Sequence, residues 1–134
     1  MLPELKKTAM NVPNPLSNDG FSIPLRASFT VFKNLPLFGF ATNNLAPKLI
    51  LFKEGIEFRV ITTRHRRYDE IESVDARQTF GTHNLILCWR GRFLAFSANL
   101  GKEEPLVALL RFFRDRGTVL SHRAQSLLAE RSMS

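Results

Sequence analysis

The segment from Pro105 to Arg116 constrains the fold of this chain more than any other, because its spacing predicts a short amphipathic helix. Apolar residues recur at positions i, i+3, i+4 and i+7 and form one stripe: Leu106, Leu109, Leu110 and Phe113. Pro105 suits the first helical turn, and Gly117 suits the position just past the helix end. Nearly everything before this segment, residues 21–98, has the pattern of short strands and turns. We therefore expect the apolar stripe to cover a sheet.

The strands are indicated by alternation of apolar and polar residues. Residues 25–31 alternate strictly, and residues 49–61 and 85–96 each read as a hairpin, joined through Gly55 and Gly91 respectively. In contrast, residues 34–44 combine turn formers with apolar side chains and are expected to form an apolar loop. Residues 62–67 are expected to form a basic turn.

Three apolar residues follow that turn at intervals of three: Tyr68, Ile71 and Val74. This spacing fits a helix better than a strand. A one-turn distortion or a bulge that leads into a strand would produce the same spacing.

The length of 134 residues fits one domain that can bury a core of its own. Residues 1–20 are rich in Pro and Asn and are expected to form a loosely ordered arm, and residues 21–117 the domain itself. Residues 118–134 have a weaker helical pattern and are expected to form a second short helix, which could support homo-oligomerisation, or a tail.

These elements together resemble the pleckstrin-homology-like superfamily, in particular its bacterial and GRAM-like branches. The resemblance covers roughly residues 25–117 and rests on the two hairpins, the spacing of Tyr68, Ile71 and Val74, and the helix 105–116. It implies a mainly β fold: a partly open barrel of about seven antiparallel strands, plugged by one amphipathic helix. An oligonucleotide-binding barrel is the alternative, but that family places its helix in the middle of the chain.

The resemblance also bears on ligands. Many members of the superfamily bind inositol phospholipids through closely spaced basic residues near the first strand pair, whereas this sequence has only Arg26 and Lys33 there. Other members bind peptides or proteins. Fold alone does not select among these ligands.

Positive charge is the clearest functional signal in the sequence. The net charge of +7 favours anionic partners such as lipid headgroups, nucleic acid or acidic proteins. Two predicted turns hold the candidate anion-binding or headgroup-binding residues: Arg64, Arg66, Arg67, Arg90 and Arg92. The alternative is a solvated rim balanced by the acidic residues that follow the first turn: Asp69, Glu70, Glu72 and Asp75.

The expected apolar loop is the second candidate for binding. Its large side chains, which would either fold back onto the barrel or form a docking surface, are Leu35, Leu37, Phe38 and Phe40. Nucleic acid would need exposed aromatic residues beside the charge, and only Tyr68, Phe80 and Trp89 are placed to serve. Trp89 is expected to be a core residue.

The sequence offers little for catalysis, and we expect no enzyme activity, no cofactor and no metal. The three histidines lie far apart, and none has metal-ligand spacing to Cys88, which sits in an apolar strand. Neither a glycine-rich phosphate loop nor a stretch long enough to span a membrane occurs. We expect a cytoplasmic binding module that acts as a protein-interaction or scaffold domain, with peripheral binding to anionic lipids at the inner face of the membrane as the alternative. Nucleic-acid binding is a further alternative.

Overall fold

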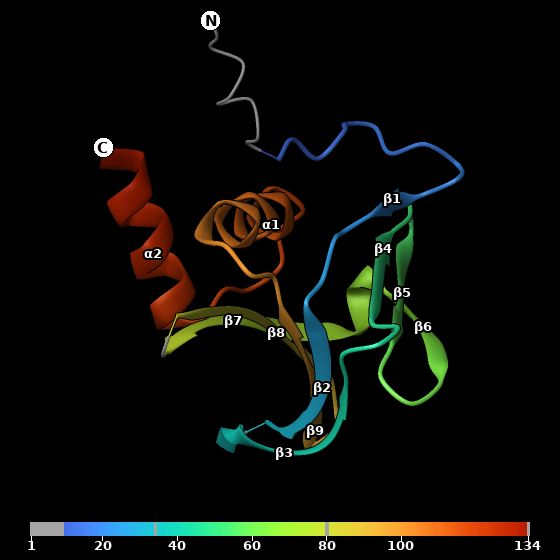
Figure 1. Ribbon diagram of the computed structural model, residues 1–134. Coiled ribbons are helices and arrows are strands. Elements are labelled where there is room, and N and C mark those ends of the chain that lie inside the picture. The colour runs from blue at the N-terminus through green and yellow to red at the C-terminus, as the bar shows by residue number, and fades with distance from the viewer. Residues whose placement is uncertain (1–9, 34, 80, 134) are drawn as a thin grey trace, which may run out of the picture.

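Nine antiparallel strands in two sheets and two C-terminal helices make up the described part of the chain in the computed structural model (Figure 1). That part comprises residues 10–33, 35–79 and 81–133, without the side chains of residues 35–40 and 132–133. The prediction of a mainly β chain with a C-terminal helix is confirmed. Within these ranges no ladder joins the two sheets, so no closed barrel forms, and the expected partly open barrel is supported only as far as two antiparallel sheets.

The first sheet has the strand order β1-β4-β5-β6. Its strands are β1 (Phe21–Ser22), β4 (Lys48–Leu51), β5 (Gly55–Arg59) and β6 (Thr63–Arg67). The predicted hairpin is present, and it pairs buried residues: Leu49 with Phe58 and Leu51 with Ile56. Gly55 is required at the start of β5, because a Cβ there would stand 2.3 Å from the carbonyl oxygen of Arg66.

The second sheet is strongly curved and has the order β3-β2-β9-β8-β7 (Figure 1). Its strands are β2 (Ala27–Phe32), β3 (Leu35–Asn43), β7 (Ile71–Thr79), β8 (Thr82–Trp89) and β9 (Leu94–Asn99). The hairpin predicted for residues 85–96 is confirmed as β8–β9. Its turn contains Gly91, whose φ of 74° lies in the left-handed region that favours glycine.

Two segments expected to be loops are strands instead. The apolar segment 35–43 is β3, which pairs with β2 through a ladder with two register shifts. Pro36 and Gly39 are tolerated there because β3 is the outermost strand, so its free edge needs no hydrogen-bond donors. The basic segment expected as a turn is β6, paired with β5. The strand was not recognised from the sequence because residues on both of its faces are polar, so apolar and polar residues do not alternate along it.

The chain passes from the first sheet to the second through a 3-10 turn at Tyr68–Glu70. The Tyr68 hydroxyl donates a hydrogen bond to the carbonyl oxygen of Phe52 at 2.5 Å, and the Arg90 N–H donates to the carbonyl oxygen of Glu70 at 2.8 Å. The ladder between β7 and β8 then shifts register between Ile71 and Ser73. The spacing of apolar residues therefore reflects a turn and a bulge that lead into a strand, rather than a helix.

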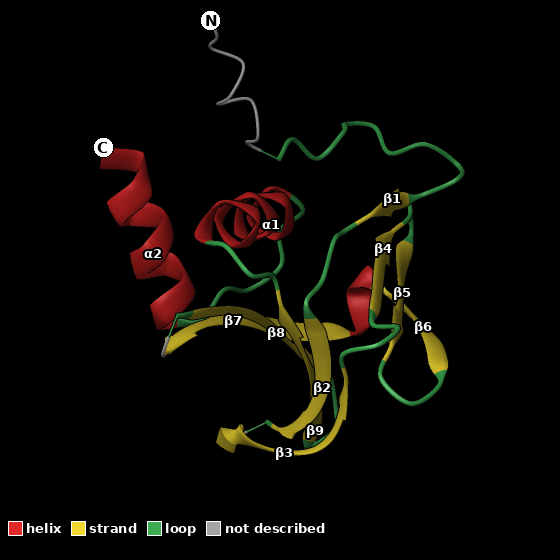
Figure 2. Ribbon diagram, viewed as in Figure 1, coloured by secondary structure: helices red, strands yellow, loops and turns green. Residues whose placement is uncertain are grey.

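Helix α1 (Glu103–Asp115) packs against β7 and β8 of the second sheet, and Figure 2 shows it above the arch that these strands form. The predicted stripe is the buried one, since its residues have no exposed surface: Leu106, Leu109, Leu110 and Phe113. The sheets meet beside this helix. The ring of Phe58 from the first sheet lies 5.0 Å from that of Trp89 and 4.8 Å from that of Phe96 in the second. Trp89 is 5% exposed, which confirms its place in the core.

Helix α2 (His122–Met133) packs against β7 and α1. Four apolar residues of this segment are buried, namely Leu120, Ala124, Leu127 and Leu128. Ser121 caps the helix, because its Oγ accepts the Ala124 N–H at 3.1 Å. Residues 118–133 are therefore part of the packed structure. Neither α1 nor α2, the two helices of the described ranges, combines the length and apolar character needed to cross a bilayer.

Candidate functional site

The candidate site is a groove at the open side between the two sheets, and its charge comes first from β6. Side chains alternate along a strand, so Arg64 and Arg66 share one face. Their cross-strand partners on β5 are Phe58 and Ile56, both buried. The two arginines therefore lie on the inward face of the first sheet, while the intervening His65 lies on the other face and contacts Glu57 at 2.9 Å.

A third arginine comes from the second sheet. Arg92 lies in the turn between β8 and β9, where its N–H donates to the carbonyl oxygen of Trp89. It lines the same groove, of about 380 Å³, as Arg64 and Arg66. The floor of the groove is apolar and includes Phe58, Trp89 and Phe96. No Asp or Glu of the described ranges lines it.

Arg66 is the most constrained of the three cations. Its Cζ lies 5.8 Å from the centroid of the Trp89 ring, and its Nη1 donates to the carbonyl oxygen of His65 at 3.1 Å. Its Nε is buried and has no hydrogen-bond partner among the described residues; the nearest carboxylate oxygen, on Glu70, is 3.9 Å away. The charge of Arg66 is therefore shared between the ring of Trp89 and the ion pair with Glu70.

Arg64 and Arg92 are exposed and form no ion pair within the described ranges. Their guanidinium groups retain donors that match the oxygens of a phosphate or carboxylate. The groove therefore combines three cations on an apolar floor.

The other two predicted arginines lie outside this groove. The Arg67 Nε is 3.1 Å from the Asp69 carboxylate, and the Arg90 Nε donates to the carbonyl oxygen of Asp69 at 3.3 Å. Both flank the 3-10 turn. The five predicted residues are thus divided into a group of three in the groove and a pair around Asp69, where the charge of Arg67 is balanced.

Three large apolar side chains in turns are exposed, one of them in the lining of the groove, and the sequence-based reasoning missed them. Ile61 in the β5–β6 turn is 69% exposed and lines the groove, and Phe93, next to Arg92, is 70% exposed. Leu45 in the β3–β4 turn is 95% exposed. That turn is tied to the groove side, because the Asn43 Nδ2 donates to the carbonyl oxygen of Val60 at 2.7 Å. The sequence did contain a signal for these exposed side chains, namely an apolar residue within an otherwise polar turn.

The second predicted site, formed by Leu35, Leu37, Phe38 and Phe40, lies on β3, but these side chains are outside the described residues. Of the aromatic residues considered for stacking on bases, Tyr68 is 9% exposed and Trp89 5%, while Phe80 is outside the described ranges. Two of the three are therefore buried, and an exposed aromatic side chain beside the charge is instead that of Phe93, next to Arg92.

The residues considered for catalysis are dispersed. His65 contacts Glu57, and the Nδ1 of His83 is 2.9 Å from the Nε2 of Gln78. Cys88 is buried, and burial raises the pKa of its thiol, which disfavours the thiolate. Among the described residues, no three His, Cys, Asp or Glu side chains gather in a way that could hold a metal ion.

A scan against protein-family models and a search of curated proteins found no match to this chain.

Proposed function

We propose that this chain is a non-catalytic module with a pleckstrin-homology-like fold, and that it binds the surface of anionic membranes through the groove of Arg64, Arg66 and Arg92. The fold proposal is supported by two antiparallel sheets with a helix packed against β7 and β8 of the second sheet. The observation that carries the functional proposal is the gathering of three arginines on an apolar floor, beside exposed Ile61 and Phe93.

Charge alone is too weak to hold the protein on a membrane. A basic residue near an anionic surface contributes about 1 kcal/mol, so three arginines contribute about 3 kcal/mol. That energy corresponds to a dissociation constant of only about 6 mM. The net charge of +7 adds long-range attraction, which salt screens. The arginines therefore orient the protein and need a second source of affinity.

The exposed apolar side chains provide that second source. Insertion of a large apolar side chain into the acyl boundary gains about 1.5–3 kcal/mol when burial is complete. Ile61, Phe93 and Leu45 are each more than two-thirds exposed and belong to three separate turns. Together with the arginines they match the combination of apolar and basic groups that peripheral membrane binding requires.

A protein partner is the second candidate, and one observation favours it. Strand β3 is the outermost strand of the second sheet, and its outer edge pairs with no other strand of the described ranges. A sheet edge of this kind can take up an extended segment of another protein. Its sequence, residues 35–43, carries no charge that would discourage such pairing. This interaction would serve a scaffold role.

Vesicle sedimentation tests the membrane proposal. The chain is mixed with vesicles of phosphatidylcholine alone or of phosphatidylcholine with phosphatidylserine, in about 0.1 M and about 1 M salt, where the Debye length falls from about 10 to about 3 Å. We expect sedimentation only with the anionic vesicles, weaker at high salt. The double variant Arg64→Glu/Arg92→Glu should lose it, and Phe93→Ser should weaken it about tenfold.

The matched control is Lys102→Glu, which reverses an exposed charge that forms no ion pair within the described ranges and lies outside the groove. It should weaken vesicle binding far less than the single variant Arg92→Glu, which changes the net charge by the same amount. Equal losses for both reversals would show that net charge, rather than the groove, drives binding. Absence of sedimentation with anionic vesicles at low salt would overturn the membrane proposal in favour of the protein partner.

A further inference from the structure

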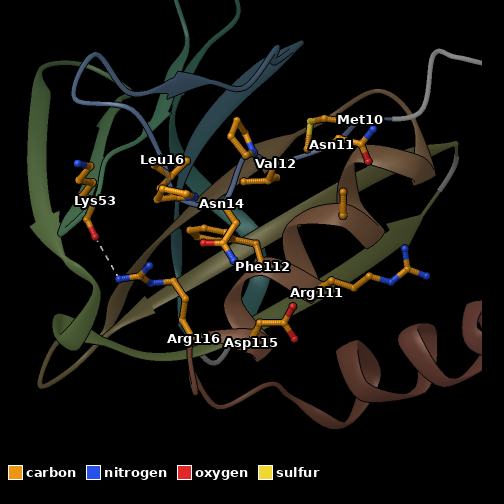
Figure 3. A pocket seen from close by; sticks show the side chains of 13 residues that line it. Met10, Asn11, Val12, Asn14, Leu16, Lys53, Arg111, Phe112, Asp115 and Arg116 are labelled. Carbon is orange, nitrogen blue, oxygen red and sulfur yellow. Dashed lines mark hydrogen bonds between the residues drawn. The ribbon is translucent and has the colours of Figure 1, made fainter.

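A larger cleft lies on the opposite side of the core from the groove, between α1 and the segment 10–16. Four residues of α1 line it at positions i, i+3, i+4 and i+7: Ala108, Arg111, Phe112 and Asp115. They form a second face of the helix, next to the buried stripe. The cleft has a volume of about 690 Å³, within the range of about 300–1,000 Å³ that is typical of small-molecule sites (Figure 3).

Its charge is positive. Three cations line the cleft, namely Lys53, Arg111 and Arg116, against one carboxylate, Asp115. That carboxylate is already paired, because the Nε and Nη2 of Arg114 each lie 3.1 Å from its Oδ1. Lys53 and Arg111 form no ion pair within the described ranges. The cleft therefore favours an anion over a neutral or cationic ligand.

Arg116 is held in position before any ligand arrives. Its Cζ lies 3.9 Å from the centroid of the Tyr68 ring and 5.5 Å from that of Phe112. Its Nη2 donates to the carbonyl oxygen of Lys53 at 3.1 Å, the bond that Figure 3 marks with a dashed line. The remaining guanidinium donors have no partner in the described ranges. A fixed guanidinium with free donors suits a carboxylate or sulfonate, because little side-chain entropy is lost on binding.

The remainder of the cleft is largely apolar. Val12 and Leu16 of the arm and Phe112 of α1 line it, and in Figure 3 Phe112 lies between Arg116 on one side and Arg111 on the other. Two side-chain amides, of Asn11 and Asn14, add neutral polar groups. An apolar ligand body over Phe112 would place an acidic group at Arg116. Arg111 extends toward the opposite side and would add a weaker, longer-range attraction.

We propose that this cleft binds a small organic acid: an aromatic or aliphatic body between the arm and Phe112, and a carboxylate or sulfonate on Arg116. The site is separate from the arginine groove and does not depend on membrane binding. Its charge, volume and apolar lining set the class of ligand.

Two probes that differ only in charge test this proposal. The fluorescent anion 8-anilinonaphthalene-1-sulfonate is compared with N-phenyl-1-naphthylamine, which has the same ring system without the sulfonate. We expect one sulfonate probe to bind per chain and to shift the backbone amide resonances of residues 10–16 and 108–116. We expect the neutral analogue to bind about tenfold more weakly, because it lacks the charged contact with Arg116.

Variants locate the two parts of the site. Arg116→Gln should remove most of the preference for the sulfonate while leaving the neutral analogue bound. Ala108→Trp, which fills the cleft from α1, should abolish binding of both probes. Ala129→Trp on the exposed face of α2 and Lys102→Gln are the matched controls for bulk and for charge, and both should bind like the wild type. Thermal unfolding is followed for each variant, so that only folded protein is compared.

Three outcomes would overturn the proposal. One is that the sulfonate probe fails to bind the wild type. Another is that it shifts resonances outside the cleft, such as those of residues 60–66 and 89–96. The third is that Arg116→Gln keeps the full preference for the charged probe, which would make Arg116 only a structural contact of Tyr68.

Discussion

The carboxylate of Asp75 on β7 and the guanidinium of Arg123 on α2 form an ion pair, with the Arg123 Nη2 2.6 Å from the Asp75 Oδ2. Ser121, just before α2, donates its hydroxyl to the Oδ1 of the same carboxylate at 2.6 Å. One partly buried acid thus binds two side chains of the C-terminal segment. This contact joins α2 to the sheet. We expect it to make the free energy of unfolding fall as the pH becomes acidic.

Burial alone would raise the pKa of Asp75, but hydrogen bonds from Arg123, Ser121 and the Ala76 N–H lower it below its usual value. The folded-state pKa is thus below the unfolded value of about 3.9, so the contribution to stability is complete above that pH and is lost as the pH falls through the folded-state pKa. We expect Asp75→Asn to cost about 1–2 kcal/mol at neutral pH and much less near pH 2.

Urea unfolding at both pH values measures this difference. The control is Asp69→Asn, which removes an exposed acid paired with Arg67, and it should cost less than about 1 kcal/mol. A cost for Asp75→Asn that does not change with pH would show that the side chain acts by packing rather than by charge.

Two adjacent phenylalanines of α1 should differ in their contribution to stability. Phe113 has no exposed surface, whereas Phe112 is only partly buried and lines the cleft. We expect Phe113→Ala to lower the free energy of unfolding by about 3–5 kcal/mol, because it leaves a cavity in the core. Phe112→Ala should cost less than half as much. Urea unfolding of the two variants makes the comparison, and similar costs would contradict the described orientation of α1.

Gly55 should tolerate substitution far less well than Gly91. A Cβ at Gly55 would stand 2.3 Å from the carbonyl oxygen of Arg66, a backbone atom that cannot move without disturbing the β5–β6 ladder. We expect Gly55→Ala to cost more than about 2 kcal/mol, and also to weaken vesicle binding by displacing Arg66. Gly91 has open space around it, so Gly91→Ala should cost only about 1 kcal/mol, for its positive φ. Thermal unfolding and sedimentation of both variants test this order.

The single tyrosine of the chain allows a direct optical test of the packing around the 3-10 turn. Burial raises the pKa of Tyr68 to about 12, against the opposing charge of Arg116. Because the folded-state pKa lies above the unfolded value of about 10, the neutral phenol stabilises the fold at lower pH, and this contribution is lost as the pH rises through the folded-state pKa. Ultraviolet absorbance should show phenolate only near pH 12 in the native protein and near pH 10 in urea.

Arg116→Gln provides the matched variant for this titration. Loss of the cation over the ring should move the pKa of Tyr68 further upward if the hydroxyl stays buried. Native titration near pH 10 would contradict the burial of the Tyr68 hydroxyl against the Phe52 carbonyl oxygen.

Local patterns were sufficient for much of the fold. The helix stripe, the two hairpins at Gly55 and Gly91 and the burial of Trp89 follow from spacing and turn chemistry, which act over a few residues. The segments that were misassigned, β3 and β6, have atypical strand compositions: one holds Pro36 and Gly39, and the other is almost entirely polar. Both are edge strands, and an edge position becomes known only when the strand order is known.

Periodicity and composition were enough to predict a mainly β, strongly basic chain with a helix at residues 105–116, and to locate its candidate arginines in two segments. Which of these arginines lie together became known only from the tertiary structure. It placed Arg64 and Arg66 on the inward face of β6 beside Arg92, and separated Arg67 and Arg90 around Asp69. It also brought the arm and the second face of α1 together into a cleft. The physical reason is the distance in sequence over which each effect acts. Periodicity within a few residues specifies which face of an element a residue occupies, whereas the neighbours of that face depend on packing between elements that are far apart in the sequence.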